Sequence, residues 1–251
     1  MHKLFLPLVS NQTDRPRFGV IASGNPGLGI PWYNYIANAC TQTGGGEYFP
    51  MVWGAAADRP GLACEGKPLL FLNEPEFANQ ANMTPVEAAT LLYEYRNWSG
   101  RLYGFGAQHT SWEWFNAAMA AYEQKFRLPL PLTGIHLHVY THNDLRLSDF
   151  TRWRLLADTR GWDIVVSEIG HLPIGETTAQ DIASALPVIL DMAIKELRPS
   201  YVFWFSLVNT GVEYNDGFHW SRTALYDKNG ETVVGAAWTK YTRWRYRVKE
   251  N

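Results

Sequence analysis

Residues 70–76 read LFLNEPE, an apolar run that ends abruptly at an amide, a carboxylate and a proline. The run has the composition of a short buried strand, and Pro75 cannot extend a strand ladder because it lacks a backbone N–H. Glu74 therefore stands at the tip of that strand. The alternative is that Glu74 only caps the next helix or faces solvent, so a functional role requires a partner elsewhere in the chain.

Similar apolar, β-branched or aromatic runs recur along the chain, with helical patterns between several of them. One such helix is announced by Thr84-Pro85-Val86-Glu87, a capping box with proline at the first helical position. Strands that are apolar nearly throughout and alternate with helices indicate a parallel sheet covered by helices. The predicted strands are 17–23, 31–38, 47–54, 68–75, 101–108, 133–140, 163–170 and 200–207.

Eight strands fit a closed barrel, so the predicted fold is α/β, a single (β/α)8 TIM barrel. The length of 251 residues is also usual for that fold. A doubly wound open sheet remains the alternative. Since no linker, composition shift or repeat divides the chain, residues 17–251 are expected to form one catalytic barrel domain, and residues 1–16 an N-terminal extension or linker.

The charge balance argues against a nucleic-acid partner. Lys and Arg number 22 against 24 Asp and Glu, and the most basic stretch, near the C-terminus, is modest. We expect no membrane partner either, because no segment approaches the roughly 18 apolar residues of a span. The apolar run within the opening MHKLFLPLVS is too short for the apolar core of a signal peptide. The 11 Trp and 13 Tyr exceed the needs of a core and suggest rings available to a ligand.

Cys40 and Cys64 are the two cysteines, and neither lies in a metal-binding spacing. They could form one bridge or remain two buried thiols, and the sequence slightly favours thiols. No cofactor and no metal is predicted.

The carboxyl ends of the predicted strands carry two carboxylates, Glu74 and Glu168. Catalytic groups of (β/α)8 barrels come from such ends, and these two lie on well-separated strands that can face each other across the mouth. Retaining glycoside hydrolysis requires two carboxyl groups about 5 Å apart, one protonated as the acid and one ionised as the nucleophile. The pair therefore suggests that chemistry.

Other polar and aromatic side chains accompany the pair. His136, His138 and Tyr140 alternate along one strand, so they share a face; His136 is expected to be a satisfied core histidine, whereas His138 and Tyr140 can each hydrogen-bond a carboxylate. The His136-x-His138 pair also raises the alternative of a metal-dependent hydrolase, although its strand ends lack the further ligands. Aromatic residues near strand ends suit a cleft that stacks on sugar rings. Those proposed to bind substrate are Trp32, Trp53 and Trp204.

These motifs together carry a resemblance to a known clan. Asn73-Glu74-Pro75 after an apolar strand, His138-x-Tyr140, Ser167-Glu168 and the aromatic last strand resemble the retaining glycosidases with (β/α)8 barrels. Within that clan, residues 50–54 (PMVWG) before residues 71–76, with an aromatic second strand, resemble glycoside hydrolase family 128, which acts on β-1,3-glucans. The short link between the first two strands is a departure from that pattern, as is Ser167, where Thr is more frequent.

The resemblance implies a retaining, endo-acting hydrolase of a β-glucan, with Glu74 as acid/base on the fourth strand and Glu168 as nucleophile near the end of the seventh. It places Asn73 against the sugar 2-hydroxyl, Tyr140 against the nucleophile and His138 in the same cluster. Retaining hydrolysis of mannan, xylan or β-1,4-glucan, or a catalytically silent carbohydrate-binding barrel, remain alternatives. The expected partner is a polysaccharide or oligosaccharide, the expected state a monomer, and the expected location extracellular, where such polymers occur.

Overall fold

Eight parallel strands form one sheet in the computed structural model, which describes residues 16–22, 26–42, 45–141, 147–208 and 218–247. Every predicted strand is present, although several are shorter than expected. Around the sheet the order is β2-β1-β8-β7-β6-β5-β4-β3. Each strand pairs with its sequence neighbours, except that β2 and β3 stand at the two ends of this order, and the first and last strands, β1 and β8, pair with each other. The strands are β1 (Arg17–Ile21), β2 (Trp32–Tyr33), β3 (Met51–Val52), β4 (Leu69–Phe71), β5 (Leu102–Gln108), β6 (Gly134–Thr141), β7 (Asp163–His171) and β8 (Tyr201–Trp204).

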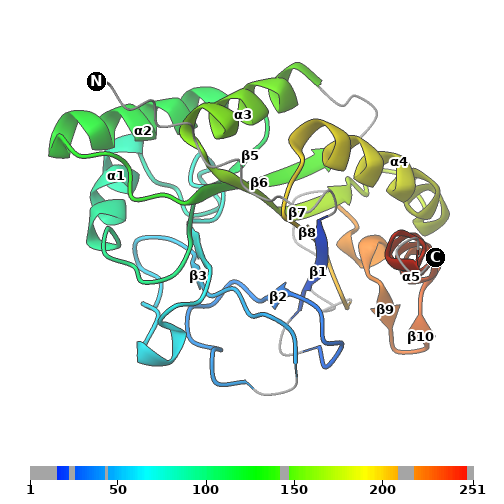
Figure 1. Cartoon of the computed structure of the whole chain (residues 1–251). Coiled ribbons are helices and arrows are strands. Elements are labelled where there is room, and N and C mark those ends of the chain that lie inside the picture. The colour runs from blue at the N-terminus through cyan, green and yellow to red at the C-terminus, as the bar shows by residue number, and fades with distance from the viewer. Residues whose placement is uncertain (1–15, 23–25, 43–44, 142–146, 209–217, 248–251) are drawn as a thin grey trace, which may run out of the picture.

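The two short strands β2 and β3 complete the ring. The backbone N–H of Trp32 donates to the carbonyl oxygen of Glu47 at 3.0 Å, and that of Phe49 donates to Trp32 at 3.0 Å. An isolated parallel bridge joins Trp32 to Tyr48. The sheet therefore curls into a nearly closed barrel (Figure 1), and the prediction of a single (β/α)8 barrel is confirmed over the open sheet.

In the described parts of the chain, five α-helices lie outside the strands (Figure 1). The predicted capping box starts the first: Thr84 Oγ1 accepts the Glu87 N–H, and the Glu87 carboxylate accepts the Thr84 N–H at 2.8 Å. Among the described residues, no helix is long and apolar enough to cross a membrane. The helices are α1 (Pro85–Glu94), α2 (Trp112–Phe126), α3 (Leu147–Arg160), α4 (Ala179–Leu197) and α5 (Val233–Arg247), with the minor elements η1 (Leu62–Cys64), η2 (Trp220–Thr223), β9 (Tyr226–Asp227) and β10 (Gly230–Glu231).

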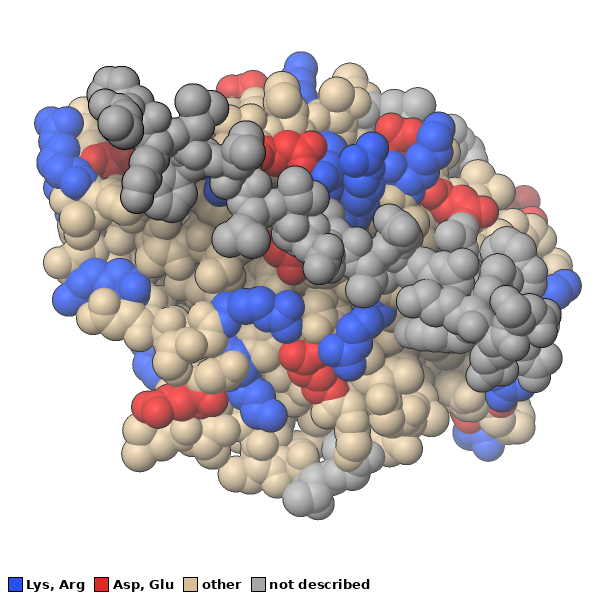
Figure 2. All heavy atoms as spheres, viewed as in Figure 1, with Lys and Arg blue, Asp and Glu red and all other residues tan. Residues whose placement is uncertain are grey.

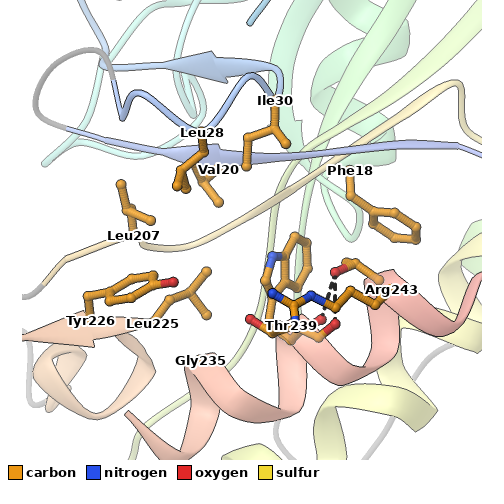
Figure 3. A pocket seen from close by; sticks show the side chains of 12 residues that line it. Phe18, Val20, Leu28, Ile30, Leu207, Leu225, Tyr226, Gly235, Thr239 and Arg243 are labelled. Atoms are coloured by element: carbon orange, nitrogen blue, oxygen red, sulfur yellow. Dashed lines mark hydrogen bonds between the residues drawn. The ribbon is translucent and has the colours of Figure 1, made fainter. Parts of the chain in front are cut away.

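The helical layer is incomplete next to β1. The described part of the chain between β1 and β4 contains no α-helix, so loops surround β2 and β3 (Figure 1). On the outer side of β1, Val20 instead faces α5 across a cavity of about 250 Å³, which Leu28, Leu207 and Trp238 also line (Figure 3). The short link noted in the sequence thus leaves a hollow, lined by both apolar and polar side chains, where a barrel helix would pack.

Charges of both signs are interspersed on the face in Figure 2, without a continuous basic area among the residues drawn in colour. One such group joins Arg17 and Arg101 to Glu47, with N–O distances of 2.7 and 3.2 Å. Tyr201 donates to the same carboxylate at 2.7 Å. This mixture agrees with the near-neutral composition. The proposed extension at residues 1–16 lies outside the described residues except for Pro16.

The preference for two free thiols was wrong, because Cys40 and Cys64 form a disulfide with a Cα–Cα distance of 5.3 Å. Cys64 is buried, and both sulfur atoms lie close to the carbonyl oxygen of Ala37. The sequence could not decide this, since pairing depends on how the loop after β2 meets η1 in space. The bridge ties together the two loop segments that replace a helical layer.

Removing the bridge with the double change Cys40→Ala and Cys64→Ala should lower the free energy of unfolding by roughly 3 kcal/mol, because a 24-residue separation is no longer constrained in the unfolded chain. Guanidinium denaturation monitored by tryptophan fluorescence measures this. Wild-type protein kept in a reductant is the control and should shift equally. An unchanged midpoint in both would contradict a stabilising bridge.

Candidate active site

Glu74 lies on a short, strained turn that follows β4. The strand ends at Phe71, and Glu74 has φ +42°, a left-handed conformation unusual for a residue with a side chain. Its N–H donates to Gly106 O at 2.9 Å, and its carbonyl oxygen accepts the Phe77 N–H at 3.1 Å. These bonds hold a backbone that would otherwise relax, and only 8% of Glu74 is exposed.

Gly106 makes this approach possible. It lies at an irregularity in the β5–β6 register, with φ +66°. A Cβ at Gly106 would lie 2.3 Å from Leu72 O and 2.6 Å from His136 Cε1. The bulge therefore requires glycine and lets the end of β4 lie against β5.

A second irregularity aligns Glu168 with the histidine strand. Between Leu137 and His138 the β6–β7 register shifts, so that His138 pairs with Glu168. Glu168 is 4% exposed. One carboxylate oxygen of Glu74, one of Glu168 and a ring nitrogen of His138 all lie within 4.8 Å of one another. The two carboxylates predicted from strand ends are therefore neighbours.

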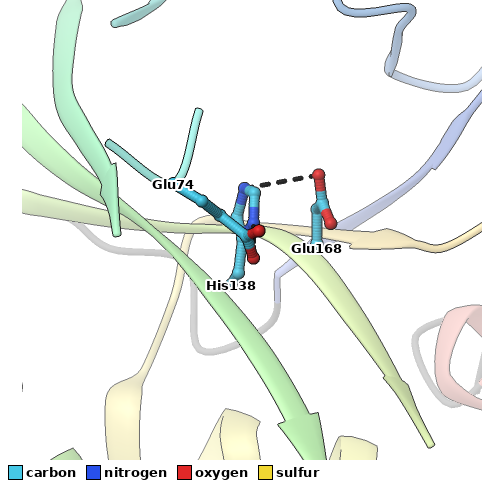
Figure 4. Close-up of side chains that lie close together, drawn as sticks. All are labelled: Glu74, His138 and Glu168. Carbon is cyan, nitrogen blue, oxygen red and sulfur yellow. Dashed lines mark hydrogen bonds and ion pairs between the residues drawn. The ribbon is translucent and has the colours of Figure 1, made fainter. Parts of the chain in front are cut away.

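The imidazole of His138 lies between the two carboxylates (Figure 4). Its Nδ1 is 3.0 Å from Glu74 Oε1 and its Nε2 is 3.4 Å from Glu168 Oε1. Burial alone would lower the pKa of His138, but Glu168 and then Glu74 outweigh it and raise that pKa. A protonated imidazole here offsets the negative charge of both carboxylates.

Tyrosine hydroxyls surround Glu168. Tyr140 donates to Oε2 at 2.5 Å, while Tyr35 donates to Oε1 at 2.8 Å. Tyr33 lies 3.1 Å from Oε1 and 2.8 Å from the carbonyl oxygen of Ser167. Burial raises the pKa of Glu168 above its usual value, although His138 and the tyrosine donors oppose that rise. The predicted contact of Tyr140 with Glu168 is thus present. Tyr33 on β2 and Tyr35 just after it were missed, because they lie far from Glu168 in sequence.

An amide network lies beside Glu74. Gln108, at the end of β5, donates from Nε2 to Glu74 Oε1 at 3.2 Å, and its backbone N–H donates to Glu76 Oε1 at 2.8 Å. Burial raises the pKa of Glu76. Asn73 is 4% exposed and donates to Gln80 Oε1 at 3.0 Å, while its Oδ1 meets no hydrogen-bond partner among the described residues. Gln108 is the last residue of a predicted strand, but no sequence pattern indicated that it contacts Glu74.

His136 is a core histidine, as expected. Its ring nitrogens lie 2.9 Å from Ser167 Oγ and 3.1 Å from Phe71 O. Burial lowers the pKa of His136 to about 3, so it remains neutral. Because both nitrogens are engaged, His136 and His138 do not offer two free imidazoles to one metal ion. Within the described chain, the group with the spacing of a metal site is Glu74, His138 and Glu168.

The tryptophans expected to bind substrate lie in different places. Trp204 is fully buried; its indole nitrogen donates to Thr223 O at 2.9 Å and its ring meets Trp238. Trp32 is 1% exposed and packs on Tyr48. Neither ring has a free face for a sugar, so the structure contradicts those two expectations, while Trp53 is partly exposed beside Asn73.

The aromatic wall beside Tyr140 consists of other residues. Phe205 and Trp220 are both partly exposed, with ring centroids 6.0 and 5.3 Å from that of Tyr140. They also contact each other at 4.9 Å. Phe205 rather than Trp204 lies near Tyr140 because adjacent residues of a strand point to opposite sides. Trp204 faces the helices, and Phe205 faces the mouth.

Glu168→Gln should raise the free energy of unfolding at pH 7 by about 1 kcal/mol, or roughly 3 °C in melting temperature. The folded-state pKa of Glu168 is raised, so its ionisation destabilises the fold as pH increases through that pKa. Below the usual Glu value both proteins are neutral at this position, and the difference should vanish. Calorimetry at pH 7 and pH 4 measures it; an equal or lower melting temperature at pH 7 would refute the argument.

A model of the glycosyl hydrolase catalytic core family matches residues 24–237. No curated protein matches the chain in sequence. The solved structures of similar fold include three from glycoside hydrolase family 128.

A subgroup I endo-β-1,3-glucanase from Amycolatopsis mediterranei, in complex with laminaritriose, is 21% identical with a TM-score of 0.67; the match covers 90% of this chain and 100% of that one. A subgroup II endo-β-1,3-glucanase from Pseudomonas viridiflava is 21% identical with a TM-score of 0.68, covering 88% and 96%. A curdlan-specific exo-β-1,3-glucanase of subgroup III from Blastomyces gilchristii is 20% identical with a TM-score of 0.60, covering 88% and 97%.

At such identities the structural likeness establishes the shared barrel. The family model spans most of the chain and includes both glutamates. The chain therefore belongs to the glycosyl hydrolase catalytic core family.

Proposed function

We propose that this protein is a retaining β-1,3-glucan hydrolase, endo-acting, with Glu168 as nucleophile and Glu74 as acid/base. The observation that carries the proposal is the proximity of the two carboxylates, whose nearest oxygens lie within 4.8 Å. Retaining enzymes place these groups about 5 Å apart, whereas inverting enzymes need roughly 6.5–9.5 Å to admit a water. The three family-128 structures, all named as β-1,3-glucanases, support the choice of glucan.

In the first step, Glu168 attacks the anomeric carbon while Glu74 gives its proton to the departing glycosidic oxygen. Gln108 and His138 both contact Oε1 of Glu74. Their donors fix the orientation of the carboxyl group and leave Oε2 to carry the proton toward the leaving group.

In the second step, Glu74 is ionised and removes a proton from the water that releases the sugar from Glu168. The His138 imidazole lies against both carboxylates, and its raised pKa favours the charged form. It stabilises whichever of the two is ionised at each stage. Asn73 stands beside Glu74, and its buried Oδ1 accepts no hydrogen bond from the described residues.

The substrate contacts would come from the aromatic wall. Phe205, Trp220 and Trp53 present partly exposed rings near the strand ends, and such rings stack on the apolar faces of sugars. The proposal includes action on polymers outside cells, by a monomer.

Replacing either glutamate should abolish hydrolysis of soluble β-1,3-glucan, with a loss of at least about 10³-fold in kcat, because each acts in the transition state. Reducing-sugar release from a panel of β-1,3, β-1,4 and mixed-linkage glucans, mannan and xylan measures this, with Glu123→Gln on the surface as a matched control.

Azide separates the two roles. With an activated aryl glycoside, Glu74→Ala should form a β-glycosyl azide and Glu168→Ala an α-glycosyl azide, since azide enters in place of water or in place of the nucleophile. Chain-length analysis of the products tests endo action. Turnover of another polymer alone would overturn the glucan assignment, and no turnover by folded wild-type protein would favour a binding-only barrel.

The acidic limb of kcat/KM against pH should lie above the usual pKa of a glutamate. The nucleophile must be ionised in the free enzyme, and burial raises the pKa of Glu168, so activity is lost as pH falls through that raised value. Initial rates at low substrate concentration between pH 3 and 8 give the limb. A limb at or below the ordinary glutamate value would contradict the assignment.

A further inference from the structure

Tyr35 is joined to Glu168 more directly than its neighbour Tyr33. The hydroxyl oxygen of Tyr33, which has a single proton to donate, lies nearer to Ser167 O, at 2.8 Å, than to Glu168 Oε1, at 3.1 Å. The Tyr35 hydroxyl lies 2.8 Å from Oε1. Tyr33 is fully buried, whereas Tyr35 is partly exposed at the mouth. Tyr35 can therefore contact the nucleophile at the place where a sugar must enter.

The backbone at Tyr35 is held in a strained conformation. Its φ is +62°, in the left-handed region. Tyr48 is hydrogen-bonded to the residues on either side: its hydroxyl lies 2.8 Å from Asn34 Oδ1 and 2.6 Å from Ile36 O. The N–H of Met51 also donates to Ile36 O at 3.1 Å. Strain of this kind persists only where the surroundings enforce it, and here it aims one hydroxyl at Glu168.

The two oxygens of Glu168 are unequally occupied. Each carboxylate oxygen offers about two lone-pair sites. Oε1 faces Tyr35, Tyr33 and, at 3.4 Å, His138 Nε2. Among the described residues, only Tyr140 is hydrogen-bonded to Oε2. A lone pair therefore remains on Oε2 for a bond to carbon.

We propose that Oε2 is the attacking atom of Glu168 and that Tyr35 is a positioning residue that holds Oε1 and stabilises the carboxylate as it departs in the second step. The inference rests on the proposed function and adds a residue to it. When water attacks the anomeric carbon, Glu74 takes the proton, the carbon–Oε2 bond breaks, and its electron pair returns to Glu168. Part of the returning charge resides on Oε1, where Tyr35 donates without transferring its proton.

The first test examines the free protein and needs no turnover. The δ-carboxyl carbon of Glu168 is followed by NMR against pH, and its signal is assigned by its absence in Glu168→Gln. Tyr35→Phe should raise the titration midpoint, because the variant removes a donor to the ionised form. The other groups facing Glu168 are unchanged: His138 and Tyr140 from β6, Tyr33 from β2 and Glu74 beyond β4. Tyr241→Phe, which removes a hydroxyl bonded to Asp191 on the far helices, is the matched control and should titrate as wild type.

The second test isolates the second chemical step. A dinitrophenyl β-glycoside of laminaribiose has a leaving group that needs no acid, so release from Glu168 limits turnover. Tyr35→Phe should lower kcat by about 10- to 100-fold, the range expected for a lost hydrogen bond to a charged group. The KM should fall with kcat as the glycosyl-enzyme accumulates, and a stoichiometric burst of dinitrophenolate should precede the slow phase. Tyr241→Phe should behave as wild type.

Each outcome decides the proposal. An unchanged NMR midpoint in Tyr35→Phe would show that Tyr35 does not hold Glu168 in solution. A kcat/KM that falls as far as kcat, without a burst, would place the contribution in the first step and overturn the role of Tyr35 in the second. Should Tyr35→Phe not fold, Tyr48→Phe removes the hydroxyl that holds the residues flanking Tyr35, and it should shift the NMR midpoint and the burst in the same direction. Wild-type protein inactive on every glucan would refute the proposed function, while the NMR midpoint would still decide the Tyr35 contact.

Discussion

The burial of Glu168 is the constraint on which the rest of the site depends. A carboxylate 4% exposed within an apolar barrel is stable only when donors replace the water it has lost. Tyr35, just after β2, and Tyr140 on β6 supply them, and the imidazole of His138 lies 3.4 Å away and is positively charged when protonated. Burial still raises the pKa of Glu168, and the nearby Glu74 carboxylate adds to that rise.

Those donors depend on barrel closure. In the order of the sheet, β2 is separated from β7 by β8 and β1, so Tyr33 and Tyr35 reach Glu168 across the interior. That reach requires β2 to be fixed against the segment before β3, which the hydrogen bonds of Trp32 to residues 47 and 49 provide. The short strands thus matter less for ladder length than for the direction of their aromatic side chains.

Two register irregularities place the remaining groups. The bulge at Gly106 lets β4 approach β5 and hold Glu74, and the shift beside His138 brings Glu168 into register with it. Without these bulges, strict alternation would turn one partner away from the mouth. The hollow beside β1 lies apart from the site: the residues that line it include neither carboxylate.

The sequence by itself determined the eight-strand rhythm and the two glutamates at strand ends, because apolar runs that end in a carboxylate are local patterns. It also identified His138 and Tyr140, since they share a strand face. Only the tertiary structure decided the disulfide, the contacts of Tyr35 and Gln108, and the choice of Phe205 over Trp204 at the mouth. Each of these depends on which distant segments meet or on which way a side chain points at a strand end, and neither bulges nor strand closure can be read from spacing along one chain.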